Sequence, residues 1–320
     1  MGHEILVSVT RGGFDESHHF GAYCVVADGK VVRSKGDMET PYFMRSAAKP
    51  FQALAVVESG AADRFGFTDE ELSLCVGSHN GTPHHAATAK SMLDKCGESP
   101  DLLRCGGHRP LGRATYEDYV RRSYVPGRLE DNCSGKHAGM IAAAKAWSEE
   151  TKTYAEPGHR VQRHNLHNLA RYGGVAESDV RIAPDGCAVP SFGVSVETMA
   201  RAIGAFVAGG RDPAADRLMA AVQGHPEMVA GQGRFDTRLM RTAGGKILAK
   251  MGAEGVQVIG VRGREDLGIA IKVIDGAGRA VQALAATLLK DFGVIDANGL
   301  VEWTIRTREG DPVGDLRVSL

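Results

Sequence analysis

The sequence predicts a mixed α/β (α+β) fold, in which one antiparallel sheet is built from both ends of the chain and a mostly helical middle covers it. The first forty residues and the last 66 or so carry strand-like apolar patterns, and the stretch between them has helical spacing punctuated by Gly and Pro. We expect a single catalytic domain over residues 1–320, with the sheet drawn from about 1–40 and 255–320 and the helical layer from about 41–254.

The amino-terminal segment predicts three strands. They are ILVSVT (5–10), GAYCVV (21–26) and KVVRS (30–34), which are rich in β-branched residues. Asp28-Gly29 separates the last two. This pair of residues favours a two-residue hairpin turn, because both positions of such a turn need a positive φ. The chain therefore starts as an antiparallel sheet.

The middle of the chain predicts helices, because strong helix formers recur there at helical apolar spacing. The clearest segments are PFQALAVVESGAADRFG (50–66), HAATAKSMLDKCG (85–97), GMIAAAKAWSEE (139–150), HRVQRHNLHNLARYG (159–173) and SVETMARAIGAFVAGG (195–210). The polar run from Ser148 to His159 is interpreted as a loop. The run from Lys246 to Lys250 is interpreted as a helix end, where cations are favourable.

The carboxyl-terminal part returns to strands. GVQVIGV (255–261) and GIAIKVID (268–275) are predicted to be buried strands, AVQALAATLLKDFG (280–293) a helix, and EWTIRTR (302–308) a last strand. Strands at both ends of the chain lead us to expect that the two termini share one sheet.

Composition excludes several classes of function. The 320 residues include 38 basic and 39 acidic side chains, giving a net charge of -1 without a long run of one sign, so nucleic acid is not an expected partner. The sequence has no run of 18 apolar residues, and MGHEILVSVT lacks the features of a signal peptide, so we expect a cytoplasmic protein that does not bind membranes. The six cysteines form no C-x-x-C pair and are expected to be reduced.

Ser46 and Lys49 form an S-x-x-K motif at a predicted helix start. Residues three apart share a helix face, and Pro50 is tolerated only in the first turn, so the serine must lie at the beginning of the helix. There a hydroxyl beside an amine is a potential nucleophile and base, provided that burial or a neighbouring cation lowers the pKa of the lysine. The same pattern also occurs at ordinary amphipathic helix starts.

Two further elements follow in the order that S-x-x-K enzymes show. Ser78-His79-Asn80 has the form S-x-N in a Gly-flanked loop, and Lys250-Met251-Gly252 has the form K-x-G directly before a predicted strand. Each alone is also typical of a turn or a helix end. Together and in order, they favour acyl transfer by a serine.

Four longer segments resemble one family. RSAAKPFQALAVVESGAADRFGF, SHNGTPHH, DNCSGKHAGM and RIAPDGCAVPSFG are similar to the asparaginase II type of L-asparaginase, the rhizobial class. The resemblance implies a fold similar to serine β-lactamases and serine glutaminases, a homodimer, and hydrolysis of L-asparagine to L-aspartate and ammonia. A related glutaminase or another S-x-x-K acyl hydrolase stays open, as does a non-catalytic protein that binds amino acids or zinc.

The resemblance also assigns roles to residues. It implies Ser46 as nucleophile, Lys49 as its general base, Ser78 as a second catalytic serine and Lys250 as the partner of Ser78. The residues implied to line the substrate site are Arg45, Lys136, His137 and Asp185. A zinc ion, one per chain, is implied to be held by Cys133, Lys136 and Cys187.

Overall fold

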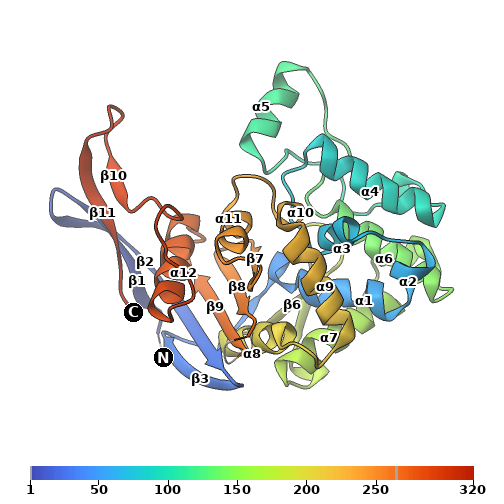
Figure 1. Cartoon of the computed structure of the whole chain (residues 1–320), viewed down its shortest axis with the longest axis horizontal. Helices are drawn as coiled ribbons and strands as arrows, with labels where there is room; N and C mark the ends of the chain where they lie inside the picture. The colour runs from blue at the N-terminus through green and yellow to red at the C-terminus, as the bar shows by residue number, and fades with distance from the viewer. Residues whose placement is uncertain (1, 264–265) are drawn as a thin grey trace.

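The computed structural model describes residues 2–263 and 266–320, and it has the mixed α/β architecture predicted from the sequence (Figure 1). Its large sheet runs, in spatial order, through β10 (Thr304–Arg306), β11 (Pro312–Val318), β1 (Glu4–Arg11), β2 (Phe14–Ala27), β9 (Leu267–Val273), β8 (Val256–Val261) and β7 (Ile247–Gly252), with β3 (Lys30–Lys35) paired to β2. The two ends of the chain therefore share one sheet, as expected.

The registers show how the termini meet. On one side of the first hairpin, Val7 of β1 lies opposite Val318 of β11. On the other side, Tyr23 of β2 lies opposite Ile271 of β9, and all these pairings are antiparallel. The predicted hairpin turn is confirmed, because Asp28 and Gly29 connect β2 to β3 with φ values of 46° and 71°.

Helices fill the middle of the chain. They are α1 (Lys49–Glu58), α2 (Ala61–Arg64), α3 (Asp69–Val76), α4 (Pro83–Cys96), α5 (Arg113–Arg121), α6 (Ser134–Ala146), α7 (Arg160–Gly173), α8 (Val196–Val207), α9 (Pro213–Gly224), α10 (Pro226–Val229) and α11 (Phe235–Thr242), with α12 (Gly278–Asp291) near the carboxyl end. Short 3-10 turns lie at η1 (Arg45–Ala48), η2 (Pro100–Leu102), η3 (Thr151–Thr153) and η4 (Glu177–Asp179).

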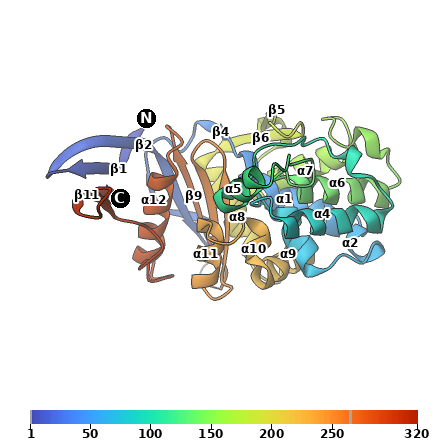
Figure 2. The same cartoon turned by 90° about the horizontal axis from the view of Figure 1, so that it is seen from above.

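The central strands are covered on both faces. Figure 2 shows α8 and α12 on opposite sides of β9, and every residue of β8 and β9 is buried. Close approach of α8 depends on Gly268, because a Cβ there would lie 2.0 Å from the carbonyl oxygen of Ala200. These two central strands, buried on both sides, form the base beside which β7 reaches the helical layer.

Three features differ from the expectation. The run from Lys246 to Lys250 is not a helix end: α11 stops at Thr242, and Lys250 lies in β7 opposite Val258. A small sheet also forms inside the predicted helical layer, from β4 (Pro41–Phe43), β6 (Pro190–Ser195) and β5 (Arg181–Pro184). Strand β11 was not anticipated either. Short apolar runs do not distinguish strand from helix by periodicity, so pairing with neighbours decides such segments.

Two further findings concern the whole described chain. Across residues 2–263 and 266–320, no helix is both long enough and apolar enough to cross a membrane. All six cysteines are buried and carry free thiols. Two of them, Cys133 and Cys187, lie at the site described next.

Candidate active site

A cleft of about 440 Å³ lies where the helical layer meets the end of β7. Its walls come from η1, the loop after α3, the segment before α5, the start of α6 and the loop between β5 and β6. Among the predicted site residues, those that line it are Arg45, Ser46, Ser78, Cys133, Asp185 and Cys187. Segments far apart in the sequence therefore place two serine hydroxyls in one cavity.

Ser46 is held in the 3-10 turn that leads into α1. The turn is fixed to the small sheet, because the Met44 N–H donates to the Phe192 carbonyl at 2.8 Å. Arg45 has a φ of 51°, which costs a non-glycine residue roughly 1–3 kcal/mol. Helix α1 begins at Lys49 with Pro50 in its first turn, as the S-x-x-K-P pattern predicts. Ser46 is half-buried and faces the cleft.

Lys49 is buried behind the cleft, and its amine is surrounded by acceptors. Its Nζ donates to Ser78 Oγ at 2.9 Å, to the Asn132 carbonyl at 3.2 Å, and to the Gly77 carbonyl. The expected direct contact between Ser46 and Lys49 is not among the hydrogen bonds of the described residues. The Lys49 amine lies near Ser78 instead, because the Gly77 carbonyl of the α3–α4 loop and the Asn132 carbonyl just before α6 accept its hydrogen bonds.

The loop from 77 to 82 is rigidly held. The Ser78 N–H donates to the Val229 carbonyl at 2.7 Å. The next residue, His79, stacks on His85 with ring centroids 4.7 Å apart, and its Nε2 lies 3.0 Å from Ser134 Oγ. Burial lowers the pKa of His79 well below its usual range, so the ring is neutral. The sequence predicted a loop here, and the packing fixes its serine.

Lys250 is fully buried in β7. Its Nζ donates to the Met251 carbonyl at 2.8 Å, so the expected pairing with Ser78 is not seen: the amine bonded to Ser78 is that of Lys49. Burial, followed by the charge of Lys49, lowers the pKa of Lys250 to about 7. An amine with such a pKa loses its proton near neutral pH.

Arg45 and Asp185 form an ion pair at the wall of the cleft. The guanidinium Nε donates to Asp185 Oδ2 at 2.8 Å, and both side chains are partly exposed to the cavity. Burial raises the pKa of Asp185, but the hydrogen bond from Arg45 and the charge of Lys136 outweigh it, so this pKa lies below its usual value. The wall thus presents a carboxylate and a cation side by side.

Cys133, Lys136 and Cys187 come together at the start of α6. The Lys136 Nζ donates to Cys187 Sγ at 2.9 Å. A hydrogen bond from Cys187 and the charges of Lys49 and Lys136 lower the pKa of Cys133, whereas the same bond and burial raise the pKa of Cys187. Burial lowers the pKa of Lys136, but the two adjacent sulfurs outweigh burial and raise it. The cluster therefore joins two sulfurs whose pKa values are shifted in opposite directions and a lysine whose charge they stabilise.

The same three side chains fit a zinc ion in part. Among the described residues, no group of three His, Cys, Asp or Glu side chains could hold a metal, so a zinc ion at this place would need Lys136 as its third donor. Two converging sulfurs match the preference of zinc. The cation would replace the ammonium as the charge that balances the thiolates, and it would leave the lysine free to bind as a neutral amine.

Two residues expected to line the substrate site lie behind it instead. His137 is fully buried, and its Nδ1 lies 2.6 Å from the Tyr154 hydroxyl. Burial lowers the pKa of His137 well below its usual range. Lys136 is buried against Cys187 and is likewise not part of the cleft lining. Both follow Cys133, the N-cap residue of α6, by about one helical turn, and the helix turns them toward the core.

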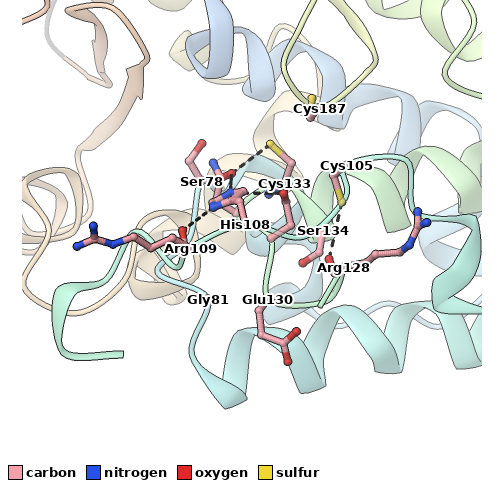
Figure 3. Close-up of polar contacts among 12 residues, drawn as sticks. Ser78, Gly81, Cys105, His108, Arg109, Arg128, Glu130, Cys133, Ser134 and Cys187 are labelled. Carbon is pink, nitrogen blue, oxygen red and sulfur yellow. Dashed lines mark hydrogen bonds and ion pairs between the residues drawn. The ribbon is translucent and has the colours of Figure 1, made fainter. Parts of the chain in front are cut away.

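Sequence reasoning missed His108, which lines the cleft in the segment before α5 (Figure 3). Its Nε2 lies 2.8 Å from Asn132 Oδ1 and 3.4 Å from Asp131 Oδ2. Burial raises the pKa of Asp131 to about 6. Asp131 and Asn132 stand in a motif that the sequence had singled out, whereas His108 sits between Gly and Arg in a loop with no recognisable signal.

The model of the L-asparaginase II family matches residues 7–318. No curated protein matches the chain significantly. The structure is similar to that of Mglu, with 16% identity, a TM-score of 0.40, and coverage of 87% of this chain and 68% of that chain.

Two further solved structures are similar. One is the "putative beta-lactamase" from Bacteroides dorei, with 14% identity, a TM-score of 0.45, and coverage of 84% of this chain and 92% of that chain. The other is a β-lactamase from Mycobacterium bovis, with 12% identity, a TM-score of 0.37, and coverage of 85% and 94%.

Proposed function

We propose that this chain, which belongs to the L-asparaginase II family, hydrolyses the side-chain amide of L-asparagine to L-aspartate and ammonia. Family membership over residues 7–318 supports an amidohydrolase. The observation that carries the chemistry is the cleft itself, which Ser46 and Ser78 both line while the amine of buried Lys49 lies 2.9 Å from Ser78 Oγ.

In the proposed acylation step, Ser46 Oγ attacks the amide carbon and its proton passes to Lys49, with the Ser78 hydroxyl as relay. A C–O bond forms and the C–N bond then breaks, and the proton returns through Ser78 to the leaving nitrogen, which departs as ammonia. The Ala47 N–H is bonded to the Met44 carbonyl at 3.0 Å, which leaves the Ser46 N–H as the candidate donor to the oxyanion.

Deacylation reverses the same proton path. Water attacks the ester carbon and gives a proton to the lysine through Ser78, and the Ser46 oxygen then leaves and takes that proton back. The products are L-aspartate and the free serine. One serine and one relay therefore serve both half-reactions.

The Arg45–Asp185 pair supplies the proposed recognition of an amino acid. Asp185 keeps its negative charge and can meet an α-ammonium group, while the guanidinium nitrogens of Arg45 that do not bond Asp185 can meet the α-carboxylate. Glutamine is longer by one methylene, which a pocket distinguishes by only about 1–3 kcal/mol, so side activity on glutamine belongs to the proposal.

The test is ammonia release by the purified protein from L-asparagine and L-glutamine in parallel. Faster release from asparagine supports the proposal. Release from glutamine alone would make the protein a glutaminase, and covalent labelling by a penicillin would point to another S-x-x-K acyl hydrolase. Asparagine binding without release from either amide would mean a non-catalytic protein. The homodimer and the cytoplasmic location are part of the same proposal, and sedimentation and cell fractionation test them.

The pH dependence of the rate tests the buried amines. In the proposed acylation Lys49 starts as a neutral amine and gains a proton, and a charge on neighbouring Lys250 opposes that gain, so acylation requires Lys250 to be neutral. Below pH 7 the Lys250 amine is protonated and turnover is slow; above pH 7 it is neutral and turnover rises. We expect kcat to increase with an apparent pKa of about 7, and Lys250→Met to lose that limb. A wild-type rate independent of pH from 5.5 to 8.5 would contradict this role.

Zinc is proposed at Cys133, Lys136 and Cys187. When bound, it would order the loop that carries Asp185 and hold the thiols together, and the proton transfers above do not involve it. We expect about one zinc per chain by elemental analysis, and removal by a chelator should lower Tm by roughly 5–10 °C. A Cys133→Ser/Cys187→Ser variant should lose the zinc and the response to chelator. Equal zinc content in both proteins would contradict the site.

A further inference from the structure

Arg234 connects the two elements that carry Ser78 and Lys250. It is the N-cap residue of α11, and its two terminal nitrogens point to different partners. Nη1 donates to Asn80 Oδ1 at 2.9 Å, and Nη2 lies 2.8 Å from Met251 Sδ. Asn80 stands two residues after Ser78, and Met251 directly follows Lys250. One guanidinium thus spans both candidate catalytic segments.

This guanidinium is partly buried and forms no direct ion pair with a carboxylate among the described residues. Burial lowers its pKa, and the nearby charge of Asp236 opposes that effect only in part. Burying a guanidinium costs desolvation free energy. An arginine is retained in such a place when its planar set of N–H donors orients neighbouring groups through hydrogen bonds. Its donors go to an amide oxygen and a thioether, which are neutral groups. Positioning therefore explains the arginine better than charge pairing does.

The Asn80 side chain is closely packed by Gly231 and Gly112 and bonded to Gln232. A Cβ at Gly231, which has a φ of 116°, would lie 2.4 Å from Asn80 Nδ2, and a Cβ at Gly112 would lie 2.8 Å from Asn80 Cβ. The Asn80 amide also donates to the Gln232 carbonyl at 3.4 Å. The segment before α11 therefore contacts both polar ends of this side chain, and movement of Asn80 would move Ser78.

Asp236, in the first turn of α11, attaches the start of this helix to the large sheet. Its Oδ2 accepts the Met251 N–H at 2.8 Å, and its Oδ1 accepts the Gln257 amide at 3.1 Å. The start of α11 is thereby attached to β7 and β8. Arg234 projects from this fixed base toward the Ser78 loop.

We propose that Arg234 is a positioning residue that fixes the Ser78 loop against the Lys250 end of β7 and so sets the geometry for proton relay. The relay itself rests on the proposed function. The mechanical part of the inference, that Arg234 orders the loop, does not depend on which substrate is cleaved.

The test compares Arg234→Met with Arg238→Met. Arg238 lies one turn later in α11 and donates to the Gly299 and Leu300 carbonyls, away from the cleft, so it is a matched arginine control. Hydrogen exchange measured by mass spectrometry on the 77–82 loop should speed up at least about tenfold in Arg234→Met and stay unchanged in Arg238→Met. Arg234→Lys, which keeps the charge but not the fork, should also exchange faster.

Kinetics on L-asparagine give the second readout. We expect kcat to fall about 10²-fold in Arg234→Met with KM changed less than about threefold, because misplacement by about 1 Å costs that much. Asn80→Ala should have a similar effect, and the double variant should be no worse than the worse single variant, because both act through one hydrogen bond.

The outcomes separate the two proposals. Unchanged loop exchange in folded Arg234→Met and Arg234→Lys overturns the positioning role, whatever the substrate proves to be. Faster exchange with wild-type kcat overturns its link to the relay. If the wild type and Arg238→Met release no ammonia from asparagine, the proposed substrate is wrong, and the exchange measurement still decides whether Arg234 orders the loop.

Discussion

Replacement of Ser46 by alanine is expected to reduce ammonia release from L-asparagine at least about 10³-fold, because no other group would then form the acyl bond. Ser46 is half-buried in a turn whose backbone is fixed by Met44 and Phe192, so the fold should survive the loss of one hydroxyl. The measurement is kcat with purified protein, together with circular dichroism and the Tm of the variant.

Two controls make the result specific. Ser59→Ala removes a hydroxyl from the opposite end of α1, where it donates to the Val56 carbonyl, and should leave kcat unchanged. Ser78→Ala should retain slow acylation, so rapid quenching and intact-protein mass spectrometry should detect an acyl group on Ser46 in that variant. Full activity of Ser46→Ala, or an acyl group found on Ser78, would show that the nucleophile has been assigned to the wrong serine.

The large sheet could be predicted because its signals are local. Asp28-Gly29 specifies its hairpin through backbone conformations that few other pairs adopt, and GVQVIGV and GIAIKVID are apolar enough to be buried on both faces. Strand β7 could not be predicted in this way. Its sequence ILAKMG carries a lysine at a buried position, and only pairing with β8 makes it a strand.

The candidate site likewise has features that the local sequence predicts and features that depend on tertiary contacts. Ser46 could be placed at a helix start because Pro50 restricts where the helix begins. The partner of Lys49 could not be foreseen, because it depends on a loop 28 or more residues away that presents the Gly77 carbonyl and Ser78. His108 had no sequence signal, since its place in the cleft comes from tertiary packing alone.

The buried amines account for much of the chemistry proposed here. Lys49, Lys136 and Lys250 lie within one region of the core, and each faces a different set of acceptors. Because like charges oppose one another in a medium of low polarity, the region resists carrying every proton at once. Lys136 is balanced by sulfur and keeps its proton, whereas Lys250 is buried and bonded to the Met251 carbonyl, and burial makes it lose its proton near neutral pH.

Lys49→Met is the variant that should separate catalysis from stability most sharply. Methionine fills a similar volume without the amine, so the proton path from Ser78 is lost, and kcat should fall at least about 10³-fold. The Gly77 and Asn132 carbonyls lose a donor, which costs about 1–3 kcal/mol each, while removal of a buried polar head offsets part of that cost. The free energy of unfolding in urea should therefore change by no more than about 3 kcal/mol.

Lys145→Met is the matched control for this change. Lys145 is a partly buried lysine of α6 that donates to the Cys96 carbonyl and to Glu98 Oε1, remote from the cleft. It should lose comparable stability and keep wild-type kcat. Lys49→Arg should stay inactive, because a guanidinium does not accept a proton at neutral pH. Substantial turnover by folded Lys49→Met would rule out Lys49 as the base and leave Lys250 as the amine able to take the proton.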